Sequence, residues 1–326
     1  MDSVETDIGW VGVRGYGERF FENVKQSVSG KIVGCYHPDP EVALAASKKM
    51  DCVTHSNFQQ LLDHDGLGAV ILILPNQFHF SFAQDALLAG KNVLVEKPLT
   101  NSYAEGLKLV ELAEKKNLVL AVGHNYRFMG HVQAMKSAIE AGRIGRPVAA
   151  EFNIGHGGGL KFDASQWRFH REKCPGGPLN MLGSHHIDTA NYLFGTVKDF
   201  SGSVKNLYAD TTAEDMSLIR IEYQSGVIVS ITNLYNSVST EFINLYGTDG
   251  ALRFNRWPEC GLWFQPKDIG CDCASYERIE FSEGNSAKLM FDEFVKAING
   301  IKSDMVSGRV ALETVRIIDA ILELSQ

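Results

Sequence analysis

The first segment of the chain that could bind a ligand is GVRGYG at 12–17, which contains three glycines. A continuous apolar run at 8–13 leads into them, and helical spacing follows at 18–28. Where a strand turns into a helix, the backbone N–H groups and the helix dipole both favour a bound anion. We therefore expect a nucleotide pyrophosphate to bind at this turn, with a simple tight turn as the alternative. The residues concerned are Gly12, Arg14, Gly15, Tyr16 and Gly17.

Arg14 stands where a dinucleotide-binding G-x-G-x-x-G pattern has its second glycine. That glycine normally lets the backbone approach a pyrophosphate closely. An arginine in its place either turns its side chain away or offers a guanidinium to a phosphate. The glycines alone leave a nucleotide site and a structural turn equally open, and the alternating elements that follow favour the nucleotide.

The end of the second apolar run, Tyr36-His37-Pro38-Asp39, bears on which nucleotide is bound. NAD-binding proteins usually place an acidic side chain here to hold the ribose hydroxyls. His37 stands at that point, and Asp39 follows two residues later. His37 could instead tolerate the extra phosphate of NADP, especially with Arg14 near, or it could be a plain loop residue. The choice between NAD and NADP stays open.

The elements that must position these residues alternate over the first 122 residues. Strands are expected at 8–13, 31–36, 67–74, 91–96 and 118–123, and helices at 18–28, 40–50, 82–90 and 103–117. The strand segments are apolar along their whole length, which is typical of a parallel sheet covered on both faces. Residues 1–122 are therefore predicted to form a Rossmann-type α/β domain.

Residues 123–326 have a different character. After a helical segment at 131–142, runs rich in β-branched and aromatic residues are separated by short turns, and amphipathic helices close the chain at 288–300 and 309–326. Strands joined in this way form an antiparallel sheet. This predicts an α+β domain with a large, open, mainly antiparallel sheet. Because few helices remain to cover it, we expect one sheet face to pack on a second subunit, in a homodimer or homotetramer.

Composition excludes several classes of protein. Lysine and arginine number 31 and aspartate and glutamate 39, a net charge of −8, so an acidic chain without a basic run is a poor match for nucleic acid. The longest apolar run, 68–75, is too short to cross a bilayer, and the acidic start MDSVETD does not resemble a secretory signal. Six cysteines do not make a disulfide framework in a chain of this size. We expect a cytoplasmic protein with free thiols.

Several short motifs occur along the chain in a fixed order. They are Pro75-Asn76-Gln77-Phe78-His79, Glu96-Lys97-Pro98, Gly123-His124-Asn125-Tyr126-Arg127, RIGRP at 143–147, Trp167-Arg168, GGPLNMLGSHHID at 176–188 and YGTDGALRF at 246–254. Together they resemble the glucose–fructose oxidoreductase/inositol dehydrogenase (Gfo/Idh/MocA) family, over most of the chain. The resemblance implies hydride transfer between NAD or NADP and a hydroxyl or carbonyl carbon of a sugar, polyol or sugar derivative.

The resemblance also implies catalytic residues. The family lysine falls on Lys97, and the histidine and last aspartate of G-G-x-L-x-D-x-G-x-H-x-x-D fall on His185 and Asp188. An ammonium can stabilise charge on a reacting oxygen, and a histidine suits general acid–base work. The alternatives are an ion pair for Lys97 and a structural role for His185. Further expected cofactor contacts are Pro75, Asn76, His79, Glu96, Lys97, Asn125, Arg127, Trp167 and Arg168.

Met181 stands where the family pattern has its first aspartate. A methionine cannot orient a histidine or accept a proton. Another carboxylate such as Asp188 takes over this role, or the substrate is less polar here, or the protein binds a nucleotide without turnover, as a regulator or scaffold. The expected substrate contacts are Lys97, Arg168, Met181, His185 and Asp188; for Arg168 a domain-interface ion pair is the alternative.

The remaining histidines and cysteines are interpreted as structural. His186 adjoins His185 and must point elsewhere on a helix. With Cys174 and Asp188 the two histidines could suggest a metal site, but adjacent histidines diverge and no paired ligand motif supports it, so no metal is expected. Cys271 and Cys273 lie in a predicted loop and are interpreted as incidental.

Overall fold

The computed structural model describes residues 6–27, 30–267 and 276–325, and it contains two compact units. The first comprises residues 1–124 and 287–315, and the second comprises 125–286 and 316–326. The sequence expectation assigned everything after residue 122 to the second domain. The structure instead places residues 287–315 with the first unit, and the packing of this segment explains the difference.

Six described strands form a parallel sheet in the first unit, in the order β3-β2-β1-β4-β5-β6. They are β1 (Thr6–Val11), β2 (Gly30–Tyr36), β3 (Val53–His55), β4 (Leu67–Leu72), β5 (Asn92–Val95) and β6 (Leu120–Val122). This confirms the predicted Rossmann-type sheet. The sequence prediction missed β3 because Val-Thr-His is too short and too polar to form an apolar run. The strand order reverses between β1 and β4, and sheets of this kind bind ligands beside the carboxyl ends of the strands there.

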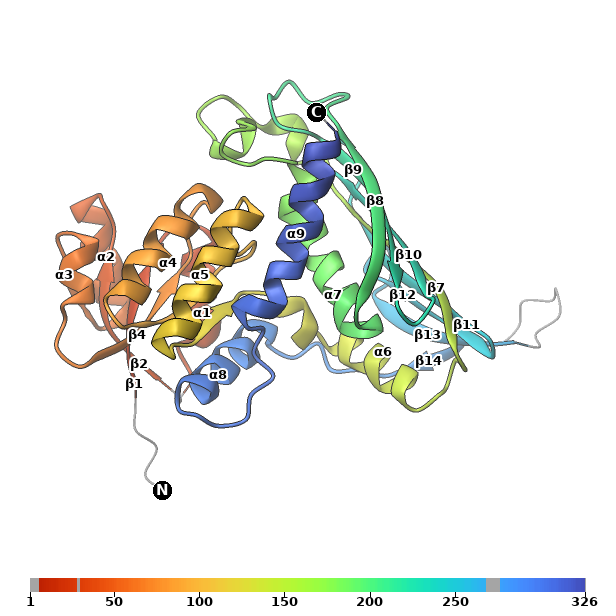
Figure 1. Cartoon of the computed structure of the whole chain (residues 1–326), viewed down its shortest axis with the longest axis horizontal. Helices are drawn as coiled ribbons and strands as arrows, with labels where there is room; N and C mark the ends of the chain where they lie inside the picture. Colours follow the sequence, from red (N-terminus) through yellow and green to blue (C-terminus); the bar gives the residue numbers. More distant parts are fainter. Residues whose placement is uncertain (1–5, 28–29, 268–275, 326) are drawn as a thin grey trace. The chain divides into compact units, whose positions relative to one another are not determined.

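Helices connect these strands and cover the sheet. They are α1 (Tyr16–Val24), α2 (Pro40–Met50), α3 (Phe58–Leu62), α4 (His79–Leu88) and α5 (Tyr103–Lys116). Leu87 of α4 and Leu109 of α5 are fully buried in one apolar core with the strands, and Figure 1 shows these two helices side by side. Ser102 accepts a hydrogen bond from Glu105 N–H and so caps α5, which fixes where the helix begins.

The C-terminal segment returns to the edge of this sheet. It contains α8 (Ser286–Ile298) and the beginning of α9 (Gly308–Leu324). Between the two helices the chain runs along β6, where the Val122 N–H donates to the Val306 carbonyl over 2.9 Å. A Cβ on Gly308 would lie 2.7 Å from the Leu120 side chain, so glycine permits this close approach. Backbone pairing and apolar packing therefore tie residues 287–315 to the first unit.

The second unit contains a sheet of eight described strands, in the order β14-β13-β12-β11-β7-β10-β9-β8. They are β7 (Pro147–Gly155), β8 (Val197–Lys205), β9 (Met216–Tyr223), β10 (Ile228–Leu234), β11 (Thr240–Gly247), β12 (Gly250–Asn255), β13 (Gly261–Pro266) and β14 (Glu277–Ile279). All neighbours are antiparallel except β7 and β10, which are parallel. The predicted open, mainly antiparallel sheet is confirmed.

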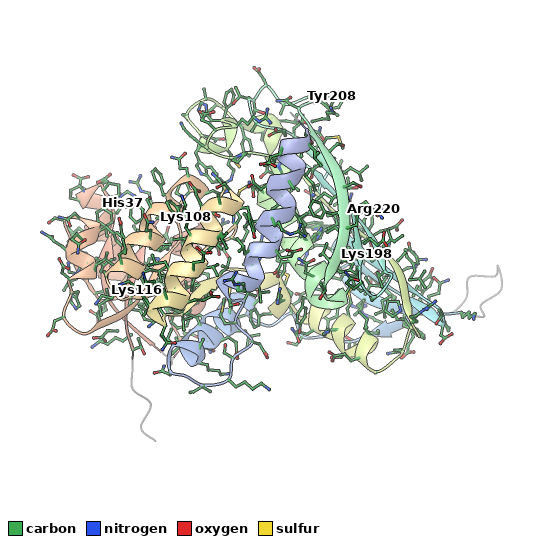
Figure 2. All side chains as sticks on the ribbon, viewed as in Figure 1. His37, Lys108, Lys116, Lys198, Tyr208 and Arg220 are labelled. Carbon is green, nitrogen blue, oxygen red and sulfur yellow. The ribbon has the colours of Figure 1, made fainter. Side chains whose placement is uncertain are left out.

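One face of this sheet carries the apolar core of the second unit. Side chains of α6 (Gly130–Glu140), α7 (Ser184–Phe194) and residues 316–324 join it there. The opposite face is mixed. Leu218 and Ile228 are exposed on it, but Lys198 and Arg220, labelled in Figure 2, form ion pairs with acidic neighbours. The sequence analysis expected one sheet face to pack on a second subunit, and this face combines exposed apolar side chains with charged ones.

Two further sequence expectations concern membranes and cysteines. Within the described ranges, each helix is too short or too polar to cross a membrane. Cys35, Cys52, Cys174 and Cys260 are free thiols. Cys271 and Cys273 lie outside the described residues, so the interpretation of that pair stays a prediction.

Candidate active site

The glycine turn between β1 and α1 is shaped by close backbone approaches. Gly12 has a φ of +94°, and a Cβ there would lie 1.8 Å from the Ile73 carbonyl oxygen. A Cβ on Gly17 would lie 1.7 Å from the Gly12 carbonyl oxygen. Neither position accepts another residue without moving backbone. The predicted turn therefore has a steric cause, because β1, β4 and α1 meet here without side chains between them.

The N-terminus of α1 fits a phosphate group. Gly15 is the residue before the helix, with a φ of +59°, and a Cβ added to it would meet nothing within 4 Å. It provides no side-chain cap, so the first backbone N–H groups of this nine-residue helix are not capped in that way. Such groups, with the helix dipole, attract a pyrophosphate. Gly12, Gly15, Tyr16 and Gly17 thus fit the dinucleotide expected from the sequence.

Three of the expected cofactor residues come together beside this turn. The Arg14 guanidinium lies 3.5 Å from the Asp39 carboxylate. The same carboxylate accepts hydrogen bonds from the first N–H groups of α2, and the His37 Nδ1 accepts one from the Asp39 N–H over 3.0 Å. The structure therefore joins the β1–α1 turn to the end of β2, as a nucleotide site on this fold requires.

The loop after β4 places Asn76 and His79 inside the first unit. His79 is fully buried, with Nδ1 2.7 Å from the Pro98 carbonyl oxygen and Nε2 2.9 Å from the Leu74 carbonyl oxygen. Burial lowers the pKa of this histidine below its usual value. We expected His79 to contact the cofactor, but both ring nitrogens face backbone carbonyls. Its observed contacts tie the loop after β4 to the loop after β5.

Glu96 and Lys97 follow β5, at the carboxyl end of the parallel sheet. Each is only 9% exposed, and the Lys97 N–H donates to the Glu96 carboxylate over 3.0 Å. Burial raises the pKa of Glu96 to about 7, although the charge of Lys97 acts in the opposite direction. A Cβ on Gly123 would lie 2.8 Å from Glu96 Oε1, so the glycine that follows β6 makes room for this carboxyl group.

In the second unit, His185 stands on the first turn of α7. Its ring stacks on Tyr126 with centroids 4.1 Å apart. Tyr126 comes from the short helix η2 (Asn125–Phe128), and burial, with the charge of Glu241, raises its pKa above the usual value. Sequence reasoning quoted Tyr126 in a motif but gave it no role. Its position in the sequence between two expected site residues, Asn125 and Arg127, could have indicated that Tyr126 also lies at the site.

Asp188 and Arg127, predicted from separate motifs, form a buried ion pair. Arg127 donates two hydrogen bonds, each 2.7 Å long, one to each carboxylate oxygen of Asp188. The Asp188 side chain is 1% exposed and the Arg127 side chain 13%. Such a planar, two-bond pair fixes the η2 segment against α7, which carries His185. The contact therefore occupies both carboxylate oxygens of Asp188, three residues after His185.

Met181, Arg168 and Asn125, also predicted to lie at the site, are partly exposed, whereas His186 is buried. Met181 lies in a π-helical turn, η5 (Leu179–Gly183), immediately before α7. The Arg168 guanidinium lies 4.4 Å from the ring centre of Trp167, and the Asn125 amide donates to Ser286 over 3.4 Å. His186 is fully buried near Phe152, and burial lowers its pKa to about 3, in line with the structural role expected of it.

The residues once considered as metal ligands have other surroundings. Within the described ranges, no group of three histidine, cysteine, aspartate or glutamate side chains has an arrangement that could hold an ion. Cys174 is buried, and Asp188 is engaged by Arg127. His185 and His186 diverge as expected, since one stacks on Tyr126 and the other lies near Phe152.

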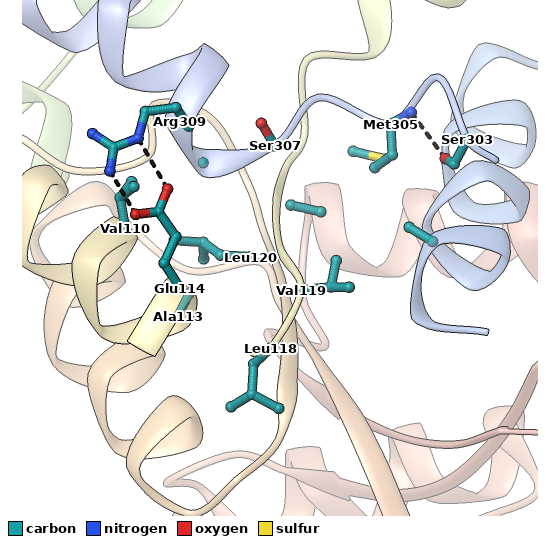
Figure 3. Close-up of a pocket in the computed structure, with 13 residues that line it drawn as sticks. Val110, Ala113, Glu114, Leu118, Val119, Leu120, Ser303, Met305, Ser307 and Arg309 are labelled. Atoms are coloured by element: carbon teal, nitrogen blue, oxygen red, sulfur yellow. Dashed lines mark hydrogen bonds and ion pairs between the residues drawn. The ribbon is translucent and has the colours of Figure 1, made fainter. Parts of the chain in front are cut away.

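A cavity of about 300 Å³ lies elsewhere in the first unit, against the beginning of β6. Figure 3 shows that apolar side chains such as Val110 and Leu120 line it, with Glu114 and Arg309 at one side. Arg309 donates two hydrogen bonds to Glu114, over 3.0 and 2.7 Å. None of the predicted site residues lines this cavity, which adjoins the opposite end of β6 from Gly123.

Two family models match the chain. Residues 6–124 match the model described as "Oxidoreductase family, NAD-binding Rossmann fold", and residues 132–253 match the GFO/IDH/MocA C-terminal domain. An uncharacterized oxidoreductase of Schizosaccharomyces pombe is 30% identical over 268 residues, which cover 78% of this chain and 71% of the relative. A 1,5-anhydro-D-fructose reductase of Ensifer adhaerens is 28% identical over 200 residues, 60% of this chain and 60% of that enzyme. The match thus spans less than two thirds of several curated relatives, including the latter.

Solved structures share the fold over almost the whole chain. A levoglucosan dehydrogenase in complex with NADH is 21% identical, with a TM-score of 0.86 over 98% of this chain and 96% of that one. The WlbA dehydrogenase of Bordetella pertussis, in complex with NADH and UDP-GlcNAcA, is 22% identical, with a TM-score of 0.85 over 98% and 95%. At these identities the likeness establishes the fold.

Proposed function

This chain belongs to the Gfo/Idh/MocA oxidoreductase family, and from that premise we propose that it transfers a hydride between NAD or NADP and a sugar, polyol or sugar derivative. The hydride would leave or reach a carbon that bears a hydroxyl or carbonyl group. The observation that carries the proposal is the sheet of the first unit, where a phosphate-binding turn and a buried Lys97 both follow the carboxyl ends of strands. The sugar-specific names of curated relatives support the substrate class.

The nicotinamide, when bound, supplies or accepts the hydride. The protein contributes first by binding the cofactor: the backbone of the turn at Gly12, Gly15 and Gly17 would hold the pyrophosphate. The ammonium of Lys97 would hydrogen-bond the reacting oxygen and stabilise its negative charge as the C–H bond breaks. The backbone that carries this side chain is held by the Lys97 N–H bond to Glu96 and by the contact of His79 with the Pro98 carbonyl.

His185 is proposed as the general acid–base. Oxidation of an alcohol releases a hydride to the cofactor and a proton to a base, and reduction returns both. The Tyr126 ring stacked on His185 would hold the imidazole plane, and the Arg127–Asp188 pair would hold the backbone that carries it. Positioned acid–base groups of this kind contribute roughly 10²–10⁴ in rate.

The test is a panel of sugars, polyols and sugar acids, read at the absorbance of the reduced nicotinamide. Lys97→Met and His185→Ala are each expected to lower kcat by about 10²–10⁴ while the affinity for the nucleotide changes little. Glu111→Gln, at an exposed position of α5, is the control, and it should leave folding and turnover unchanged. Turnover that survives both substitutions would remove the proposed roles.

Met181 favours a second candidate, a nucleotide-binding regulator or scaffold without turnover. The side chain three residues before α7 is a thioether where the family pattern has a carboxylate, and Asp188 is engaged by Arg127. Nucleotide binding without turnover on any member of the panel would favour this candidate. Met181→Asp then tests the cause, because restored turnover would assign the lost activity to that one position.

We also propose that the mixed outer face of the eight-stranded sheet packs on a second copy of the chain. Leu218 and Ile228 offer exposed apolar area there, and the flanking ion pairs offer polar partners for a rim. Light scattering at micromolar concentration is expected to give a dimer or tetramer, and a monomer would contradict this. The free thiols of the described cysteines support a cytoplasmic location.

A further inference from the structure

The adenosine half of the nucleotide site distinguishes two cofactors that differ in a single phosphate. The ribose of NAD carries a 2′-hydroxyl, and its two adjacent O–H groups donate hydrogen bonds, which an acidic side chain usually accepts. NADP carries a phosphate at that position, with oxygens that accept hydrogen bonds and a negative charge that requires a cation. The side chains at the end of β2 therefore report which cofactor is preferred.

His37 is the first residue after β2, and its geometry makes it a donor. Its Nδ1 accepts the backbone N–H of Asp39 over 3.0 Å, the shorter of its two contacts, and lies 3.4 Å from the Asp39 carbonyl oxygen. A neutral imidazole has one proton, so this contact places the proton on Nε2. The nitrogen left for a ligand is therefore an N–H group. It can donate to a phosphate oxygen, but it cannot take the place of the carboxylate that usually accepts hydrogen bonds from both ribose hydroxyls.

Asp39, the nearby carboxylate, is held by other contacts. Its Oδ1 accepts hydrogen bonds from the N–H groups of Glu41 and Val42, over 3.0 and 3.4 Å, and so caps α2. Its Oδ2 faces the Arg14 guanidinium at 3.5 Å. To bind a ribose diol it would have to compete with both the helix cap and the arginine.

Arg14 supplies the cation. Its side chain is 67% exposed, and its contact with Asp39 uses one terminal nitrogen of a planar group that carries five N–H donors. We propose that Arg14 and His37 form a subsite for the 2′-phosphate of NADP, and that this chain binds NADP(H) in preference to NAD(H). The inference rests on the proposed function and deepens it, because it selects between the two cofactors left open above. The Asp39 charge opposes the phosphate and sets the size of the preference.

The experiment measures binding, independently of turnover. The purified full chain is titrated with NADPH and with NADH by calorimetry, and 2′,5′-ADP is compared with 5′-AMP as a competitor. We expect NADPH to bind at least about tenfold more tightly than NADH, and 2′,5′-ADP to compete better than 5′-AMP. Equal or tighter binding of NADH would overturn the inference and leave the proposed function standing. Binding of neither nucleotide would overturn the proposed function itself.

Two substitutions and one control locate the subsite. Arg14→Gln is expected to raise the Kd of NADPH by about 10–100-fold and that of NADH by less than about threefold. Asp39→Ser keeps a helix cap and removes a charge, so it should tighten NADPH alone. Arg309→Gln makes the same charge change at the cavity of Figure 3 and should alter neither Kd. If Arg14→Gln weakens both nucleotides equally, Arg14 binds the shared pyrophosphate, and the subsite is wrong.

Discussion

The two units bury ionisable side chains in different ways. In the first unit, His79 at the start of α4 contacts the carbonyls of Leu74 and Pro98, and Glu96 after β5 accepts a hydrogen bond from the Lys97 N–H. In the second unit, His131 and His186 sit in the apolar core, and within the described structure neither ring nitrogen of either residue has a hydrogen-bond partner. The comparison shows that burial of a histidine does not by itself indicate a site. The backbone contacts of His79 and Glu96 hold the segment that carries Lys97, the residue proposed to act on the substrate.

The two units also differ in how deeply a two-bond ion pair is buried. Arg127 and Asp188 form a buried pair beside His185, whereas Arg309 and Glu114 form an exposed pair at the cavity of the first unit. Both pairs make two hydrogen bonds. When one partner is removed, the charge that remains from the buried pair is poorly hydrated, whereas the charge that remains from the exposed pair is hydrated. The free energy of unfolding of variants in the two pairs therefore tests this difference most directly.

Asp188→Ala is expected to have the largest effect. It leaves the Arg127 guanidinium buried and uncompensated, which typically costs about 3–5 kcal/mol. Urea unfolding measures the loss. The double variant Arg127→Leu with Asp188→Leu should recover most of it, because neither charge is then buried alone. A loss no larger than that of Glu114→Ala would break the distinction between the two pairs.

His79→Leu is expected to rank second. A neutral imidazole has one N–H, so the substitution removes one hydrogen bond and leaves either the Pro98 or the Leu74 carbonyl without its donor, at a cost of about 1–3 kcal/mol. It should also lower kcat more than it raises KM, because the loop after β5 carries Lys97. His79→Gln can donate to one carbonyl and is expected to recover part of both losses. Wild-type kinetics in the leucine variant would show that the two loops are held by other contacts.

His131→Phe tests the neutral histidines of the second unit. Burial lowers the pKa of His131 to about 3 from 6.5, so the unfolded chain binds the proton more readily. The stability that this neutral ring contributes is complete above pH 6.5 and is lost as the pH falls toward 3. For one such residue the loss between pH 7 and pH 5 is about 2 kcal/mol. Phenylalanine can keep the stacking on Phe254, so the variant should lose less stability over that interval, as unfolding at both pH values would show.

Glu114→Gln is expected to change least. Both partners of this pair are more than half exposed, so water solvates Arg309 when the carboxylate is removed. Unfolding at low and high salt checks this, since the small remaining attraction should disappear at high salt. A loss approaching that of Asp188→Ala would mean that the rim of the cavity behaves as a buried site.

Much of the first unit could be predicted because its signals are local. An apolar strand, glycines and a helical pattern adjoin one another at 8–28, and Gly12 and Gly17 have steric causes in the loop after β4 and in the turn itself. The helix caps at Asp39 and Ser102 are equally local. The return of residues 287–315 was not predicted, because pairing of Val306 with Val122 joins segments far apart in the chain.

The amino-acid sequence determined the fold of each unit and the family, because hydrophobic periodicity and glycine placement act over short distances along the chain. Only the tertiary structure decided what individual side chains do. It turned both nitrogens of His79 onto backbone carbonyls, stacked Tyr126 on His185, and set Arg14 beside Asp39. These roles depend on distance, burial and hydrogen-bond direction between separate segments, quantities that residue type and spacing do not contain.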